Sequence, residues 1–376
     1  SSAASDVYKR QVHASAWLGG SYAHTMLVKA GVTSALDMSG PGTSVLELAR
    51  EYGTGLNLAT IEYVRPGHTV SSDDPSSAEL QQLITKVQRQ GSLGIKLLGG
   101  HYPLTVAATA RAIRAAAELG AYTAFHAGTA AHGSNIEGML EAVELADGNP
   151  LHLAHINAYC RGTVLPEAEE TELALKALAA NPNISCESYL SPLNGTSAEI
   201  IDGLPGSMVT RRCLKTGGFT EDEAGMEEAL LSGWAHVNYP QGQEMTLLTG
   251  EAARDYWRGQ QTLVSVSFAV NPVGPRVRLA TAKKADGSFA VDAVSTDGGG
   301  IPRNVLLPAG LALVDLGGLS LQELVAKISY QPARLLGLAN KGSLTAGRDA
   351  DITIVDRLQR SAFATIIGGQ VCYMDG

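Results

Sequence analysis

The segment 93–159 decides the fold of this chain. It contains L-G-I-K-L-L at 93–98, A-Y-T-A-F-H at 121–126 and L-H-L-A-H-I at 151–156. Each run is apolar and short, as buried strands are, and each carries a polar residue at or near its end. The pattern predicts three strands: Leu93–Leu98, Ala121–Phe125 and Leu151–Ile156.

The spacing of three polar residues in this segment indicates a repeated βα unit. Lys96 and His126 are 30 residues apart, and His126 and His155 are 29 residues apart. The stretches between them, 105–119 and 135–146, have apolar residues at helical spacing. A (β/α)8 barrel of about 250 residues uses roughly 31 residues for each unit. The three side chains are therefore expected at the carboxyl ends of consecutive barrel strands, where such folds keep their chemistry.

The rest of the chain continues this alternation, which predicts an α/β protein with a (β/α)8 TIM barrel. Further strands are expected at Val12–Ser15, Val32–Met38, Leu56–Val64, Ile184–Tyr189 and Ser288–Ser295. Further helices are expected at Gly19–Ala30, Thr43–Tyr52, Ser76–Gln90, Pro166–Ala180 and Leu321–Leu336. We assign residues 12–340 to the barrel and expect its first strand to end near His13.

Three segments depart from the alternation. Glu187 and Asp297 are 110 residues apart, far more than the roughly 31 residues of one unit. Residues 190–287 are therefore expected to form an inserted lid or subdomain between strands 7 and 8, with alternating runs at 263–268 and 276–280. Residues 341–376 are expected to form short strands. Residues 1–11 lack a helix or strand pattern and are interpreted as a leader or an artefact.

Composition and charge exclude several functions. The net charge is −9 and no basic stripe is present, which argues against a nucleic-acid partner. No apolar run reaches the roughly 18 residues of a membrane span. The four cysteines show no C-x-x-C spacing, so reduced thiols and a cytoplasmic location are expected.

Five residues at expected strand ends suit a metal centre: His13, Lys96, His126, His155 and Asp297. Imidazole and carboxylate donors favour borderline divalent ions, zinc above all. A protonated lysine would repel such ions, so Lys96 is expected to be carbamylated, which makes it a bridging carboxylate. Two ions held about 3.5–4 Å apart would lower the pKa of a bridging water. Asp297 is the expected catalytic residue, moving the proton of that water to a leaving nitrogen.

In this arrangement the chain resembles the amidohydrolase superfamily. The resemblance rests on the Lys96 strand, His126, A-H-I-N at 154–157, S-T-D-G-G-G at 295–300, Q-P-A-R-L-L-G-L at 331–338 and G-S-L-T-A-G-R-D-A-D-I-T-I-V-D at 342–356. Hydantoinases, isoaspartyl dipeptidases and N-acyl-D-amino-acid deacylases are the most similar branches. The resemblance implies that 341–376 belong to a small β-sandwich and that the chain acts as a homo-oligomer.

One departure from the family pattern bears on activity. The family has His-x-His on its first strand, whereas this chain has Gln11-Val12-His13. A Gln amide is a poorer zinc ligand than imidazole, so the first metal would bind weakly. The half of the β-sandwich that the family places before strand 1 is also missing, so we expect an N-terminally truncated chain.

The resemblance implies a hydrolase of C–N bonds acting on a small molecule. The expected substrate is an N-acyl amino acid, a dipeptide-like amide or a cyclic amide, attacked by the metal-bridging hydroxide. A deaminase, a lactone or ester hydrolase and a non-catalytic binding protein stay open as alternatives. His101, Tyr102 and Asn157 follow ligand positions and are expected to contact substrate. One further candidate for pairing with a substrate carboxylate is an arginine after a strand end: Arg65, Arg161 or Arg303.

Overall fold

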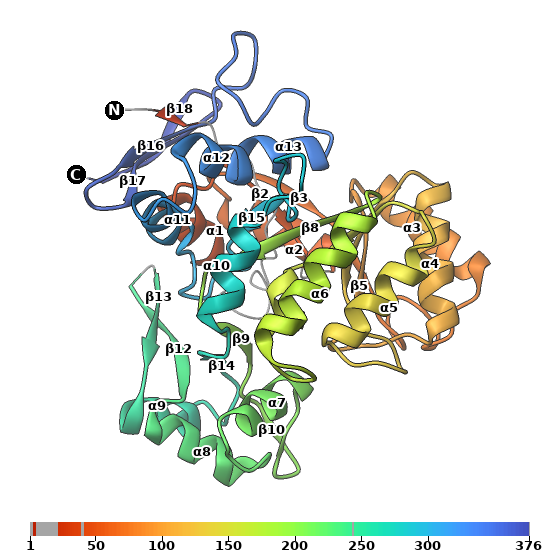
Figure 1. Ribbon diagram of the computed structural model, residues 1–376. Coiled ribbons are helices and arrows are strands. Elements are labelled where there is room, and N and C mark those ends of the chain that lie inside the picture. Colours follow the sequence, from red (N-terminus) through yellow and green to blue (C-terminus); the bar gives the residue numbers. More distant parts are fainter. Residues whose placement is uncertain (1–2, 5–21, 39–40, 243, 376) are drawn as a thin grey trace.

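The computed structural model describes residues 3–4, 22–38, 41–242 and 244–375. A parallel sheet surrounded by helices forms the centre of the molecule (Figure 1). A second unit with its own antiparallel sheet extends from one side, and a small C-terminal sheet lies on the other (Figure 1). None of the helices in the described part of the chain is long and apolar enough to cross a membrane.

The central sheet has the parallel strands expected of the barrel. Its order is β4–β5–β6–β7–β8–β15, with β4 (Glu62–Val64), β5 (Gly94–Leu98), β6 (Tyr122–His126), β7 (Leu151–Leu153), β8 (Ile184–Tyr189) and β15 (Ala293–Ser295). A second parallel pair consists of β2 (Ser34–Asp37) and β3 (Asn57–Thr60). Only Ile61 separates β3 from β4, so the third barrel strand is divided there and links the two sheets. The expected first strand, Val12–Ser15, lies outside the described residues.

Amphipathic helices pack around the two parallel sheets (Figure 1). They are α1 (Tyr22–Lys29), α2 (Gly42–Tyr52), α3 (Ser77–Arg89), α4 (Val106–Glu118), α5 (Ile136–Ala146), α6 (Glu167–Ala180), α10 (Val273–Thr281) and α11 (Leu306–Asp315). Ser76, Thr105 and Asn135 cap α3, α4 and α5 by accepting hydrogen bonds from backbone N–H groups three residues on. The start of each helix is thus fixed by its own local sequence.

The segment after β8 forms a separate unit with its own core. Its antiparallel sheet has the order β13–β12–β14–β9, with β9 (Asn194–Ser197), β12 (Ala235–Gln241), β13 (Glu244–Leu248) and β14 (Ser265–Phe268). Helices α7 (Met208–Thr216), α8 (Glu223–Ser232) and α9 (Gly250–Gly259) pack on it, and β10 (Ile200–Ile201) pairs with β11 (Leu204–Pro205). The fully buried Trp257 lies in the core and donates to the carbonyl of Ala198 at 3.0 Å.

The C-terminal segment forms a four-stranded sheet. Its order is β1–β16–β17–β18, with β1 (Ala3–Ala4), β16 (Ile352–Asp356), β17 (Ser361–Ile367) and β18 (Gln370–Met374). Thr353 donates to the carbonyl of Gly31 and Thr365 to that of Val28, both at 2.7 Å, which ties this sheet to the end of α1. The preceding helical stretch comprises α12 (Leu321–Val325), a π-helical turn (Ala326–Tyr330) and α13 (Gln331–Leu335).

Four predictions of local structure were wrong. The alternating run 276–280 lies in α10, which packs against α6, so its apolar residues follow a helical face. The strand at 151–156 ends at Leu153, because a 3-10 turn follows at Ile156–Tyr159. The eighth strand begins only at Ala293. Ala3 and Ala4, in the segment interpreted as lacking a strand, pair with β16.

Candidate metal centre

Parallel register brings Lys96, His126 and His155 to one rim of the barrel. In β5 and β6, Leu98 pairs with His126 and Lys96 with Ala124. His155 follows β7 by two residues, and Asp297 follows β15 by two residues. Because the carboxyl ends of parallel strands lie at the same edge, these side chains share one rim.

His126 and His155 lie in direct contact at this rim. Their ring centroids are 4.5 Å apart and the rings meet edge to face at 71°. Nε2 of His126 is 2.7 Å from Oγ of Ser134, whereas its Nδ1 is buried and has no hydrogen-bond partner among the described residues. A Cβ at Gly100 would lie 2.3 Å from Nε2 of His126, so this loop approaches the ring closely only because residue 100 is glycine.

Two residues of the site have a left-handed backbone. The φ angles are 40° at His155 and 46° at Asp297. Residues other than glycine seldom adopt this conformation, which costs on the order of 1 kcal/mol or more and is often found at functional sites. In both cases the turn comes directly after a short strand and redirects the side chain, and both side chains line the same pocket.

Lys96 is fully buried beneath these groups. Burial lowers its pKa to about 7, and the negative charges of Asp297, Glu187 and Asp37 partly oppose that shift. Its positive charge in turn is among those that lower the pKa of His126, after burial and His101. Lys96 therefore lies within electrostatic reach of both Asp297 and His126, and its amine is readily deprotonated near neutral pH.

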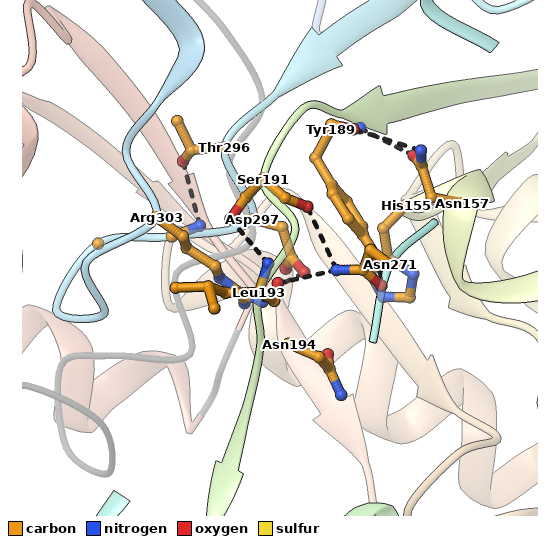
Figure 2. Close-up of polar contacts among 12 residues, drawn as sticks. His155, Asn157, Tyr189, Ser191, Leu193, Asn194, Asn271, Thr296, Asp297 and Arg303 are labelled. Carbon is orange, nitrogen blue, oxygen red and sulfur yellow. Dashed lines mark hydrogen bonds and ion pairs between the residues drawn. The ribbon is translucent and has the colours of Figure 1, made fainter. Parts of the chain in front are cut away.

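Asp297 is held by a buried ion pair. Its Oδ2 is 3.1 Å from Nη2 of Arg303, and both side chains are almost fully buried (Figure 2). Burial raises the pKa of Asp297 to about 6, with Arg303 and Lys96 opposing the rise. Thr296 and Asn304 shape the following turn, since they accept hydrogen bonds from the backbone N–H groups of residues 298 and 299.

A buried carboxylate that the sequence analysis did not single out supports the centre. Glu187, on β8, pairs with Nε2 of His152 and accepts a hydrogen bond from the backbone N–H of His155 at 2.9 Å. Nδ1 of His152 is 2.9 Å from Oγ of Ser185. Glu187 thus fixes the backbone of one expected ligand while contributing negative charge near Lys96. Its place inside a buried strand was the available signal, because a buried carboxylate needs partners.

The expected substrate-contacting residues have different surroundings. His101 lines the pocket, with its ring centroid 5.7 Å from that of His126. Tyr102 is 36% exposed and has the guanidinium of Arg65 over its ring at 4.4 Å. Asn157 is buried, and its amide accepts from the N–H of Tyr189 at 2.8 Å and donates to its carbonyl at 3.2 Å (Figure 2).

The pocket beside the rim has a cavity volume of about 100 Å³. Barrel residues His101, His126, His155, Arg161 and Asp297 form one side of it. The segment inserted after β8 supplies the other side, including four residues of α7: Val209, Arg212, Cys213 and Thr216. A lid was expected from this segment, but none of these residues was a candidate from the sequence, because no strand-end spacing marks them.

The donor set fits a metal centre in part. Within 22–38, 41–242 and 244–375, no three His, Cys, Asp or Glu side chains come close enough to hold an ion. His13, one expected ligand, lies outside the described residues, and Lys96 would contribute only as a carboxylate. The buried, unpartnered Nδ1 of His126 is a donor position that a metal ion would satisfy.

Comparisons with known proteins agree with this fold. Residues 234–372 match the model of the amidohydrolase family. A dihydroorotase from Trichlorobacter lovleyi is 54% identical over 50 residues, which are 13% of this chain and only 12% of that protein. The chain therefore matches a small part of the length of this curated relative.

Solved structures match over nearly the whole chain. An N-acyl-D-glutamate deacylase from Bordetella bronchiseptica, complexed with zinc and a phosphonate inhibitor, has a TM-score of 0.65 at 12% identity, covering 98% of this chain and 85% of that one. A D-hydantoinase has a TM-score of 0.59 at 13% identity, covering 99% and 85%. The TIM-barrel fold expected from the sequence is confirmed by these solved structures, and residues 234–372 are similar to the amidohydrolase family.

Proposed function

We propose that this protein is a metal-dependent hydrolase of a C–N amide bond in a small molecule. The observation that carries the proposal is the meeting of Lys96, His126, His155 and Asp297 from four strands at one rim, beside a pocket. The match to the amidohydrolase family and the short match to a dihydroorotase support this chemistry. The substrate would be an N-acyl amino acid, a dipeptide-like amide or a cyclic amide.

Each of these residues has a role that follows from its surroundings. His126 and His155 would provide nitrogen donors, and Asp297 and a carbamylated Lys96 would provide oxygen donors, with His13 as the fifth ligand. Two divalent ions, zinc being the favoured metal, would supply Lewis acidity and a water of lowered pKa. The low pKa of the buried Lys96 amine supports its modification, because only a neutral amine captures carbon dioxide.

Asp297 is the proposed proton carrier. The left-handed backbone turns its side chain toward the pocket, and Arg303 fixes one carboxylate oxygen there. A carboxylate held in this way can take a proton from an attacking water and deliver it to the leaving nitrogen of the amide.

The proposal is tested by metal counting together with a substrate panel. The chain would be purified as it stands and as Gln11→His, which restores the His-x-His pattern of the family. We expect more bound metal and faster turnover of amides or cyclic amides in Gln11→His. The chain with Gln11 should hold less metal than this variant, because the amide of glutamine is a weaker ligand than imidazole.

Other outcomes would point to the alternatives. Ammonia released only from aminated heterocycles would indicate a deaminase, and turnover only of lactones or esters would indicate an esterase. If neither chain holds a metal ion, the hydrolase proposal is wrong and a non-catalytic binding protein is favoured.

A further inference from the structure

We propose that Arg161 and Arg212 form a carboxylate-binding subsite in the pocket, so that the substrates are amides carrying a free carboxylate. The inference rests on the proposed function, since the subsite would select substrates for that same centre. Arg161 comes from the barrel, whereas Arg212 comes from the segment inserted after β8. Two parts of the chain that are distant in sequence would therefore hold one anionic group.

Helix α7 is oriented so that one of its faces closes the pocket. The lining residues 209, 212, 213 and 216 have the three- and four-residue spacing of a single helix face. Arg212 is the only charged residue of that face. Its two neighbours on the face, Val209 and Cys213, are uncharged, so the guanidinium is the group on this wall that can recognise an anion.

The guanidinium of Arg212 reaches across to the barrel rim. A Cβ at Gly133, in the loop between β6 and α5, would lie 3.3 Å from Nη2 of Arg212. The next residue, Ser134, is hydrogen-bonded to His126. Arg212 is therefore close to Gly133, whose neighbour Ser134 contacts the expected metal ligand. The positive charge of Arg212 thus lies beside the proposed reacting centre.

Arg161 is fixed in orientation on the opposite wall. Its Nε donates to Oδ1 of Asn271 at 2.9 Å and its Nη2 to the hydroxyl of Tyr189 at 3.0 Å. Among the described residues no hydrogen bond of its Nη1 is formed. Two neutral acceptors therefore hold the guanidinium without neutralising it, and one nitrogen is available to a ligand.

The charge of Asp297 acts on Arg161, but no ion pair neutralises either arginine within the described residues. Neither Arg161 nor Arg212 forms an ion pair with a described acidic residue. Among the described residues that line the pocket, Asp297 is the one acidic residue, and it is paired with Arg303. The pocket thus has two cationic groups that an incoming carboxylate could satisfy, and a planar guanidinium matches a carboxylate with two parallel hydrogen bonds.

The surroundings of the three arginines that the sequence made candidates distinguish them from one another. Arg65 lies over the ring of Tyr102 and does not line the pocket. Arg303 is buried with Asp297 as its partner. Arg161 alone of the three lines the pocket without an acidic partner among the described residues, so it is the one we assign to the substrate.

A binding experiment that needs no turnover tests the subsite. Methanesulfonylglycine and its neutral carboxamide, in which a sulfonamide replaces the amide, would be titrated calorimetrically into the full chain in a buffer free of carboxylates and phosphate. We expect the acid to bind about 10- to 100-fold more tightly than the carboxamide, as charge-assisted hydrogen bonds would give. Arg212→Met should remove most of this preference, and Arg212→Lys should keep part of it.

Lys215→Met is the matched control, because Lys215 is exposed on the same helix but does not line the pocket. It should leave the preference unchanged. Equal affinity for the two compounds, no measurable binding of the acid, or full preference in Arg212→Met would overturn the subsite. A preserved preference in a chain without metal or amide turnover would instead refute the hydrolase proposal while leaving the subsite standing.

Discussion

Two buried lysines lie near opposite ends of strand β15. One lies at the rim where catalysis is proposed, and the other lies at the end of the barrel that serves stability. Lys96 lies near Asp297, just beyond the carboxyl end of β15, whereas Lys327 donates to the carbonyl of Val291, just before its amino end. Both side chains are inaccessible to solvent, and burial lowers the pKa of each to about 7. Their surroundings, however, are different.

Lys327 is surrounded by groups that accommodate it. It donates to Val291 at 2.7 Å and lies 4.0 Å from the ring centroid of Phe289. Lys96 is instead surrounded by three buried carboxylates, of Asp297, Glu187 and Asp37. In TIM barrels, active sites occupy the carboxyl end and the amino end serves stability. The contrast agrees with that rule: the carboxylates near Lys96 are buried, whereas those that act on Lys327, of Asp292 and Glu323, are partly exposed, and a carbonyl and an aromatic ring hold its amine.

The largest expected effect is the loss of the metal centre in Lys96→Met. The variant keeps the length and burial of the side chain but cannot become a carboxylate bridge. Loss of partners that only orient metal ligands costs about 10- to 100-fold in affinity or activity, so loss of a ligand should reduce amide turnover by at least about 100-fold. Metal analysis of the purified protein should show fewer bound ions than in the parent chain.

The control for this variant is Lys176→Met, which removes an exposed lysine from α6. Turnover and metal content should be unchanged there. If Lys96→Met retained both, the lysine would be a structural residue like Lys327, and the functional contrast between the two ends would disappear.

Glu187→Ala should have the next largest effect, on stability. It would leave His152 and the backbone N–H of His155 without their buried acceptor. Removing the acceptor of a buried polar group costs about 1–3 kcal/mol of unfolding free energy for each group left without a partner. Urea denaturation followed by circular dichroism would measure the loss.

The exposed pair of Glu172 and Arg278 provides a control for the buried one. Glu172→Ala should change the unfolding free energy by less than about 1 kcal/mol, because such pairs contribute little in water. Equal losses in the two variants would show that Glu187 is not the anchor of the rim.

The barrel rim was predictable because strand ends repeat along the chain. Apolar runs bounded by polar residues located Lys96, His126 and Asp297, and the structure places all three near one another. The same reasoning could not find Arg212. Arg212 comes near the rim only because the inserted unit folds back over it. The βα repeat of the barrel does not extend to this unit, so the repeat could not predict that contact.

Patterns over a few residues predicted local structure less well than the βα repeat did, because packing between distant segments decides local structure. The run 276–280 alternates in polarity as a strand would, but Leu279 and Ala280 pack in the barrel's helical layer because α10 continues the βα rhythm. Asn157 was expected to face substrate from its position after His155. Its amide bridges the backbone of Tyr189, because a buried amide needs both a donor and an acceptor, and its contact with substrate stays a prediction.

The remaining expected effect is a change in the pH dependence of stability in Lys327→Met. A lysine with a folded pKa of about 7 binds fewer protons than the unfolded chain, where its pKa is about 10.4. Stability should therefore rise with pH between these values, by up to about 1.4 kcal/mol for each pH unit. The nearby Cys186, Asp292 and Glu323 oppose the effect of burial, so without them the pKa of this amine would be lower still.

Methionine at position 327 removes this rise, so the parent chain should gain stability over Lys327→Met from pH 7 to pH 9.5 in urea titrations. Lys283→Met is the control, since Lys283 lies 5.6 Å from the centroid of the same Phe289 ring but is exposed. Its difference from the parent should not change over this pH range. If the difference in unfolding free energy between the parent and Lys327→Met also stayed constant with pH, water would reach the Lys327 amine. Lys96 would then be the one of these two lysines whose pKa is lowered by burial.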